Sequence, residues 1–440
     1  MATMLSIQEP EDNFVETDFM KASFIKKDPA QGPLGWPESL AELDINASIV
    51  EDLALKTLYL GGTMSVLELS DRLRLTYNVA HEVFSRLRAD LCCQVTGMLG
   101  NIPQVAMTSQ GRSRAADLLM QSRYAGAAPV SFDSYVREVR KQSVKKVNVH
   151  EDDVRRAFAD LVVDDTTLRS MGTALNSGSS LFLYGPPGVG KTTYAEALSR
   201  ALAEDEVYIP HAIEVDGQII TVFDPSVHKA VEEPGNVSRD MRWVLCHRPS
   251  VLVGGELTVE LLDLQFGAIS RFYIAPMQMK ANNGVLIIDD FGRQRLRPEE
   301  LLNRWIVPLD RRIDFLTLAG GKKIEMPFEM LVVFASNLDP AQLVDPAFIR
   351  RIKTKIKVGA CTSEQFTEIF RRVAEQNSVK YDEDIPKRLI DFIHFELKTE
   401  LRSCYPRDII EQVCWAARYE NKEAYVDVPA LKQALLAYFA

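Results

Sequence analysis

The 440-residue chain is 46% hydrophobic and 25% charged, and it carries a formal net charge of -10. That length allows two or three folded cores, and the acidic balance argues against a protein that binds nucleic acid because it is basic overall. The six cysteines form no C-x-x-C pair, which disfavours a disulfide scaffold or a zinc site. Residues 1–18 have no signal-peptide pattern and no apolar run could cross a bilayer, so we expect a cytoplasmic protein without membrane insertion.

The first part of the chain is expected to hold a mobile arm and a small helical domain. Residues 1–45 carry prolines, glycines and charges in the pattern of an extended lead-in. Residues 46–125 then show three stretches of helical spacing, two strand-like runs and a closing helix. These elements are predicted at 48–60, at 65–73, from Thr76 or Asn78 onward, at 92–96 with 104–108, and at 109–119. Their order predicts a winged helix-turn-helix domain.

Two uses of this domain stay open. A winged helix can read DNA with its third helix, which here offers Arg86 and Arg88 but also Glu82 and Asp90. Residues 51–125 hold eight Lys or Arg against seven Asp or Glu, a balance of 8 − 7 = +1, whereas a dedicated DNA reader has a stronger basic stripe. We therefore favour protein docking or oligomer organisation over DNA binding. The arginines through which DNA would bind are Arg72, Arg74, Arg86, Arg88, Arg112 and Arg114.

A linker and the start of a second domain are expected next. Residues 126–149 contain Gly126, Pro129 and several charges, and we interpret them as a connector. From residue 150 onward, two helices are predicted at 151–161 and 166–176, and a buried strand at 181–184.

A glycine-rich loop after that strand is the strongest chemical signal in the chain. Its residues are Gly185, Pro186, Pro187, Gly188, Val189, Gly190, Lys191, Thr192 and Thr193. The backbone N–H groups of such a loop can wrap a phosphate chain, Lys191 can reach the outer phosphates, and the Thr192 hydroxyl can hold Mg²⁺. The positive end of the following helix points at the same phosphates. The loop predicts binding of a nucleoside triphosphate.

Two further apolar strands end in polar residues that suit phosphate chemistry. The run 285–288 is followed by Asp289 and Asp290. A carboxylate at the end of a buried strand is costly unless it serves a cation, so we expect Asp289 to hold Mg²⁺ and Asp290 to polarise the attacking water. The alternative is a pair of turn or cap residues. The run 331–336 is followed by Asn337, which could orient that water or touch the terminal phosphate.

Three arginines are candidates for neutralising charge in the transition state. Arg350 and Arg351 follow the segment 344–349 and could act in trans on a neighbouring subunit, with Arg351 as the first choice. Alternatively, the two only extend from an apolar patch into solvent. The last core strand is predicted at 353–358, and the rest of the chain is expected to be helical. In that part Arg407 lies at a helix start, from which it could reach over a bound nucleotide.

This order of phosphate loop, Asp-Asp strand, Asn strand, Arg pair and Pro-Arg helix resembles the AAA+ ATPases. A predicted hairpin at 313–328 and a short insert at 272–277, expected within the second helix of that fold, are similar to the MoxR-like branch. The resemblance implies an α/β fold: an AAA+ P-loop core with a parallel sheet between helices (150–360) and an α-helical lid (361–440), here preceded by the winged helix domain. It also implies ATP and Mg²⁺ as cofactors and a homo-oligomeric ring, expected to be a hexamer, that uses hydrolysis to remodel another macromolecule.

Several positions depart from the pattern of that family. The second acid of the Asp-Asp strand is usually Glu, and the shorter Asp290 would be compatible with slow hydrolysis. Arg350 stands where an Asp precedes the arginine finger of MoxR-like proteins. The segment 208–253 is longer than typical, with strands expected around 215–218, and an N-terminal winged helix is not a standard MoxR-like part.

Three functions follow from these observations. The favoured one is a chaperone-like ATPase whose N-terminal domain docks a protein partner, with hairpins at 271–272 and 319–322 facing the pore or the substrate. The second is an ATPase anchored to duplex DNA through the winged helix. The third, motivated by Asp290, is a nucleotide-dependent switch with little turnover. The sequence does not specify the partner, the ring size or the choice between ATP and GTP.

Overall fold

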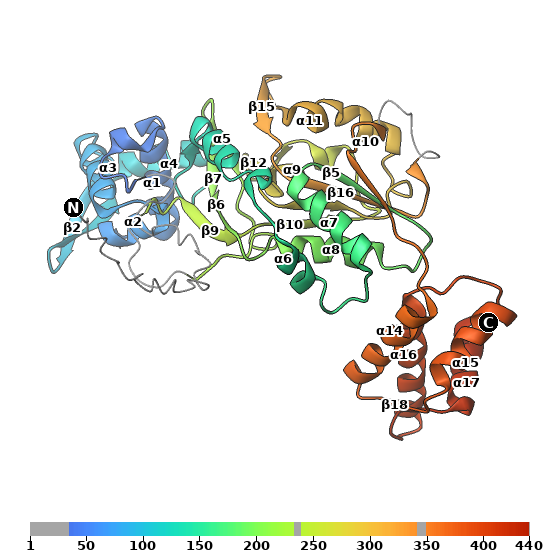
Figure 1. The fold of residues 1–440 in the computed structure, drawn as a ribbon. Helices are drawn as coiled ribbons and strands as arrows, with labels where there is room; N and C mark the ends of the chain where they lie inside the picture. The colour runs from blue at the N-terminus through green and yellow to red at the C-terminus, as the bar shows by residue number, and fades with distance from the viewer. Residues whose placement is uncertain (1–34, 233–238, 341–348, 440) are drawn as a thin grey trace, which may run out of the picture.

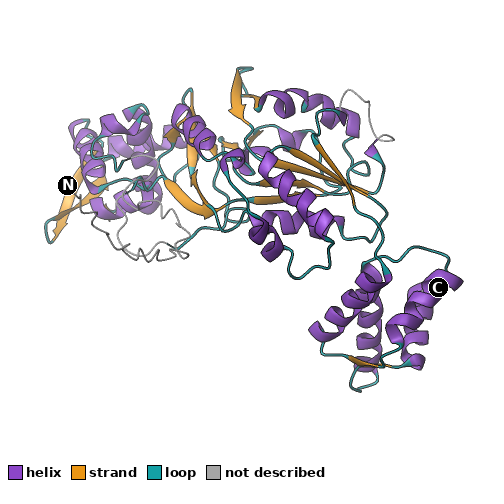
Figure 2. Cartoon of the chain, in the orientation of Figure 1, coloured by secondary structure: helices purple, strands orange, loops and turns teal. Residues whose placement is uncertain are grey.

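The computed structural model describes residues 35–232, 239–340 and 349–439. Three regions follow one another along the chain: an N-terminal unit of helices with a small sheet, a central α/β core, and a C-terminal helical region, the lid (Figures 1 and 2). The predicted arm lies mostly outside the described residues. Within the described ranges, no helix is both long and apolar enough to cross a membrane.

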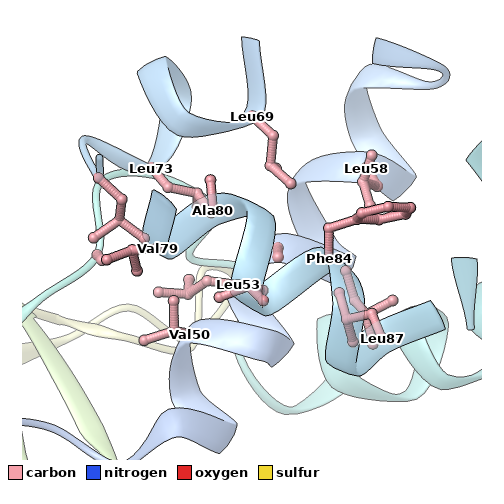
Figure 3. Close-up of a cluster of buried hydrophobic side chains, with 14 of the residues drawn as sticks. Val50, Leu53, Leu58, Leu69, Leu73, Val79, Ala80, Phe84 and Leu87 are labelled. Carbon is pink, nitrogen blue, oxygen red and sulfur yellow. The ribbon is translucent and has the colours of Figure 1, made fainter. Parts of the chain in front are cut away.

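The N-terminal unit packs its helices around one hydrophobic cluster, which includes Val50, Leu53 and Phe84 (Figure 3). Each of the first three helices begins at a polar cap, and Ser65 forms a reciprocal capping box with Glu68. The elements are η1 (Leu40–Leu43), α1 (Ala47–Gly61), β1 (Met64–Ser65), α2 (Val66–Leu73), α3 (Tyr77–Ala89), β2 (Cys93–Leu99), β3 (Ile102–Met107) and α4 (Ser109–Gln121). The strands form a sheet in the order β1-β3-β2.

The β2–β3 hairpin is longer than the sequence predicts. Its turn lies at Gly100 and Asn101, and the pairing register shifts between Val95 and Gly97. Gly97 therefore lies within a bulged strand instead of ending it.

The predicted linker at 126–149 is folded. It contains β4 (Val130–Ser131), α5 (Phe132–Lys141) and η2 (Val144–Lys146). Tyr135 and Val139, four residues apart on α5, are both buried. This helical spacing was hidden in the sequence by the turn signals of Gly126 and Pro129 just before it.

The α/β core contains a five-stranded parallel sheet in the order β10-β13-β16-β5-β17. Its strands are β5 (Ser180–Tyr184), β10 (Ser250–Val253), β13 (Val285–Ile288), β16 (Leu331–Ser336) and β17 (Thr354–Lys357). The helices near its two faces and edges are α6 (Glu151–Ala157), α7 (Asp165–Ser177), α8 (Lys191–Ala201), η3 (Glu260–Leu262), α9 (Met277–Lys280), α10 (Pro298–Arg304) and α11 (Ile306–Arg311). Leu181 and Leu183 join one hydrophobic cluster while Phe182 joins another, because neighbouring strand residues face opposite sides. Helix α6 ends four residues earlier than predicted.

A second five-stranded sheet, in the order β11-β12-β8-β7-β4, lies between the N-terminal unit and the parallel sheet (Figure 1). The strands of this region are β6 (Glu206–Pro210), β7 (Ala212–Val215), β8 (Gln218–Thr221), β9 (Trp243–His247), β11 (Gln265–Phe266), β12 (Tyr273–Ile274), β14 (Ile313–Thr317) and β15 (Lys323–Pro327). The hairpin predicted at 313–328 is present as β14–β15. The insert predicted at 272–277 includes β12, which pairs with β11 as a hairpin between η3 and α9 and also pairs in parallel with β8.

The N-terminal unit is joined to the region around this second sheet by a buried ion pair with hydrogen bonds and by an aromatic contact. The Arg242 guanidinium, which is 2% exposed, pairs with Asp240 and donates to the carbonyl oxygens of Leu43 and Pro129, both at 3.0 Å. The Phe272 ring packs edge-on against Tyr124, with ring centroids 5.5 Å apart. The segment 271–272, which the sequence suggests as a substrate-facing hairpin, therefore contacts the N-terminal unit.

The lid is a compact helical region with its own hydrophobic cluster. Its elements are α14 (Ser363–Gln376), β18 (Lys380–Tyr381), α15 (Ile385–Asp391), the π-helical η4 (Phe392–Glu396), α16 (Cys404–Tyr419), β19 (Tyr425–Val426) and α17 (Val428–Phe439). Helix α14 begins with a capping box between Thr362 and Gln365.

Candidate functional site

A cavity of about 740 Å³ lies between the α/β core and the lid. The core contributes the loop before α8 and the residues that follow β13 and β16, and the lid contributes α14 and the start of α16. The carboxyl ends of neighbouring parallel strands meet at one edge of a sheet, which is where such folds bind their ligands. The cavity therefore lies where the sequence predicts phosphate chemistry.

The glycine-rich loop connects β5 directly to α8. Gly185, Gly188 and Gly190 have φ angles of 153°, 78° and 88°, which side-chain-bearing residues rarely adopt. A Cβ atom on Gly185 would lie 2.0 Å from the carbonyl oxygen of Val358, so that position also needs glycine for space. Residues 187–193 line the cavity, whereas Gly185 and Pro186 support it from behind.

Lys191 is buried, and its ammonium group is held by three oxygen atoms. It donates to the carbonyl oxygens of Gly185 at 3.1 Å and Pro186 at 2.7 Å, and to Oδ1 of Asn337 at 2.7 Å. Burial lowers the pKa of Lys191, while the nearby charges of Asp289 and Asp290 oppose that shift. The lysine is therefore a desolvated cation held beside the loop.

Thr192 and Asp289 meet across the cavity floor. The Thr192 hydroxyl donates to Oδ2 of Asp289 at 2.8 Å. The other carboxylate oxygen of Asp289 accepts the backbone N–H of Asp290 at 2.9 Å. A hydroxyl and a carboxylate are hard oxygen donors of the kind that Mg²⁺ prefers, and this cation usually takes few protein ligands beside water and phosphate. The pair fits the predicted Mg²⁺ site.

Asp290 and Asn337 form a second pair beside Lys191. The Asn337 amide donates from Nδ2 to Oδ1 of Asp290 at 3.1 Å, while its Oδ1 accepts from Lys191. One asparagine therefore connects the lysine to the carboxylate that we expect to polarise water. Asp290 has a φ angle of 48°, so the chain turns sharply after β13.

The three candidate arginines lie in different places. Arg407, at the start of α16, lines the cavity, although its guanidinium bonds Asp408 at 3.0 and 3.1 Å. Arg350 is exposed, and Arg351 donates from Nε to Asp310 at 2.8 Å. Neither Arg350 nor Arg351 lines the cavity of its own chain. The preceding residues 341–348 lie outside the described ranges.

Comparison with known families agrees with this geometry. Residues 180–352 match the family of the AAA domain (dynein-related subfamily), and residues 362–436 match a domain of unknown function (DUF8689). Residues 180–352 form an AAA domain. The five-stranded parallel sheet, whose strand β17 lies just beyond the matched residues, is typical of the AAA+ P-loop core and confirms the predicted α/β fold.

The solved structures that the chain matches include the Thermotoga maritima RuvB Holliday junction branch migration motor, at 14% identity over 70% of this chain and 71% of that chain, with a TM-score of 0.33. Two mutants of the same protein also match. One is 12% identical, over 67% of this chain and 72% of that chain, with a TM-score of 0.35. The other is 14% identical, over 70% of this chain and 71% of that chain, with a TM-score of 0.36. No curated protein matches the chain. The assignment of the AAA domain rests on the family match and the site geometry.

The end of the cavity away from the AAA domain's phosphate loop contains residues that the sequence analysis missed. Leu161 and Val162 precede α7 and line the cavity from the core, and Ile369 of α14 lines it from the lid. Arg372 of α14 crosses to the core and donates to the carbonyl oxygens of Ala159 at 2.8 Å and Leu161 at 3.3 Å. These apolar and polar groups suit a flat heterocyclic base.

One sequence signal could have indicated this second end. Phe366 and Phe370 form the buried face of α14 in the lid core. Ile369 widens that apolar stripe beyond the lid core, and Val373, which packs against the lid core, lines the cavity beside it. An apolar stripe that is too wide for its own domain indicates a second contact.

Proposed function

We propose that the chain binds and hydrolyses ATP, with Mg²⁺ as its cofactor. The observation that carries the proposal is the continuous set of side-chain contacts from Lys191 through Asn337 to Asp290, next to the Thr192–Asp289 pair. These groups provide a cation for phosphate oxygens, a hydroxyl and carboxylate for a divalent ion, and a second carboxylate for water. Few other reactions need all three together.

In this proposal each side chain has a separate task. Lys191 and the loop N–H groups bind the outer phosphates, and Asp290 accepts a proton from the attacking water while Asn337 holds Asp290 in place. Mg²⁺, when bound by Thr192 and Asp289, supplies charge neutralisation at the phosphates. Arg407 would contribute from the lid.

Arg351, or Arg350 next to it, would act on the nucleotide of a neighbouring copy. Because neither residue lines the cavity of its own chain, the proposal includes a ring of copies with ATP at the interfaces. We propose a hexamer of the MoxR-like type. Six free cysteines in the described residues support a reducing, cytoplasmic location.

For the N-terminal unit we propose a winged helix that docks a protein partner. Arg86 pairs with Glu51 and Glu82, and Arg114 pairs with Asp52 and Asp90, so acidic neighbours compensate both arginines. The hairpin residues 92–107 include no charged side chain, although Met98 and Leu99 are exposed at its tip. A DNA-binding wing would need cations for phosphates. The charge pattern favours an ATPase that remodels a protein.

A second candidate is a nucleotide-dependent switch with slow turnover. Asp290 is a short side chain whose Oδ1 already accepts from Asn337, and this arrangement would limit its reach toward a water molecule. Binding would then be strong and hydrolysis weak.

The experiment that tests these functions is ATP turnover by the purified chain, with and without duplex DNA, at moderate salt. Turnover that is indifferent to DNA is the expected result and supports a protein partner. Clear stimulation by DNA that falls steeply with salt would overturn the proposed partner class and favour anchoring to DNA. ATP binding without turnover would favour the switch.

A further inference from the structure

The lid donates hydrogen bonds to one carbonyl group of the phosphate loop. The carbonyl oxygen of Gly188 accepts two hydrogen bonds from the lid, from the Ser403 hydroxyl and from the backbone N–H of Cys404, both at 3.1 Å. Cys404 is the first residue of α16, and the first N–H groups of a helix have no acceptor within the helix. The phosphate loop provides the acceptor for one of them.

The contact is close and depends on glycine. Gly188 has a φ angle of 78°, and a Cβ atom placed there would lie 2.7 Å from Sγ of Cys404. The segment before α16 is held in turn by the backbone N–H of Cys361, which donates to the carbonyl oxygen of Leu401 at 2.8 Å. The lid therefore rests against the loop at a defined point.

The planar Gly188–Val189 peptide bond links this contact to the direction of the Val189 N–H group. In a planar trans peptide the carbonyl oxygen and the following N–H point in opposite directions. Because the lid holds the Gly188 oxygen on its side, the N–H of Val189 points away from Ser403. Loops of this type bind phosphate through their backbone N–H groups.

We propose that Ser403 is a positioning residue that sets the orientation of the Gly188–Val189 peptide and so couples the position of the lid to phosphate binding. The inference rests on the proposed nucleotide-binding function of the cavity. If the contact favours the phosphate-binding form of the loop, then bound phosphate must favour the docked lid by the same factor, because coupling between two sites is reciprocal.

The test compares three serine variants in the full chain by calorimetric titration with ADP. Ser403→Ala removes one of the two hydrogen bonds and should weaken ADP binding about three- to tenfold, as expected for the loss of one hydrogen bond. Ser403→Thr keeps a hydroxyl and should restore the affinity. Ser199→Ala is the matched control, since its hydroxyl donates to the Glu196 carbonyl oxygen within α8 and to no other group in the described ranges.

Hydrogen exchange provides a readout that a merely structural role would not change. ADP should slow exchange in the first turn of α16 in the wild type, and this protection should be lost in Ser403→Ala while the loop itself stays protected. ADP affinity within twofold of wild type together with retained protection in Ser403→Ala would overturn the inference. If ADP does not bind, or if it binds Lys191→Ala equally well, the proposed function itself fails.

Discussion

The two ends of the cavity are built in different ways. At the phosphate end, the bonding side chains come from the loop and helix after β5 and from the residues after β13 and β16, which are strands of one parallel sheet. These side chains form hydrogen bonds with one another at 2.7 to 3.1 Å. At the opposite end, α14 of the lid faces the segment before α7, and Arg372 is the side chain that bonds across. One end is fixed by strand pairing, whereas the other depends on where the lid sits.

This difference suggests that the two ends of the cavity have separate roles in binding and chemistry. Strand pairing fixes relative positions throughout a sheet, so the phosphate end can be preorganised for chemistry. The opposite end, where we propose that the base binds, is assembled from two regions, and we expect it to open or close if the lid moves. We therefore expect substitutions at the phosphate end to abolish binding or turnover, and substitutions at the base end to change affinity by smaller factors.

The largest effect is expected for Lys191→Ala. Removing the buried cation takes away the charge that meets the outer phosphates, and ATP and ADP binding should fall below detection in calorimetry. Lys432→Ala, on the exposed side of α17, is the matched control and should bind as the wild type does. Unchanged binding by Lys191→Ala would contradict the site assignment.

A loss of hydrolysis with intact binding is expected for Arg351→Ala. An arginine supplied in trans contributes on the order of 10³-fold or more to turnover, while ADP affinity should stay within about twofold. Asp310→Asn is the control, because it removes the Arg351–Asp310 pair without removing the guanidinium. Normal turnover in Arg351→Ala would move the finger to Arg350 or elsewhere. Equal losses of turnover in Arg351→Ala and Asp310→Asn would indicate that the Arg351–Asp310 ion pair has a structural role.

A smaller effect is expected at the base end. Arg372→Ala should weaken ADP binding about three- to tenfold, because its hydrogen bonds to the carbonyl oxygens of Ala159 and Leu161 are lost. Pyrophosphate, which has no base, should bind Arg372→Ala as it binds the wild type. The neighbouring Arg371, which pairs with Glu368 and Glu375 on its own helix, provides the control Arg371→Ala. Equal losses for ADP and pyrophosphate would contradict the separation of the two ends.

The pH dependence of ADP binding should report on Lys191. Burial lowers its pKa below the ordinary value of 10.5, so the free chain loses this proton at a lower pH than an exposed lysine does. Phosphate binding needs the charged form, and affinity should therefore fall as pH rises through the lowered pKa. Titrations from about pH 7 to about pH 10 should show this fall in the wild type but not in Lys191→Arg, whose guanidinium stays charged. The same pH dependence of ADP affinity in the wild type and in Lys191→Arg would exclude Lys191 as the titrating group.

The smallest change is expected for Asp290→Glu. The longer side chain keeps the carboxylate and extends it by one methylene, so turnover should be preserved or raised by a few-fold. A steady-state assay of phosphate release measures it directly. A large loss would mean that the site is built around the shorter residue, with Asn337 placed for it.

The sequence predicted the phosphate end far better than the base end, for a physical reason. Asp289 and Asn337 each follow a short apolar run, and parallel strands bring such residues to one edge. Arg372 and Ser403 reach the cavity only because the lid packs against the core, a contact that the wide apolar stripe of α14 indicates without saying which residues meet. Tertiary packing likewise explains why α5 is a helix with one buried face where turn residues suggested a linker.

The most direct test of this account is an experimental structure of the chain with ADP and Mg²⁺ bound. The account predicts the phosphates along residues 188–192, Mg²⁺ beside Thr192 and Asp289, and the base between Leu161 and Ile369. Nucleotide bound elsewhere, or in this cavity with its base beside Lys191 and its phosphates toward Arg372, would contradict it.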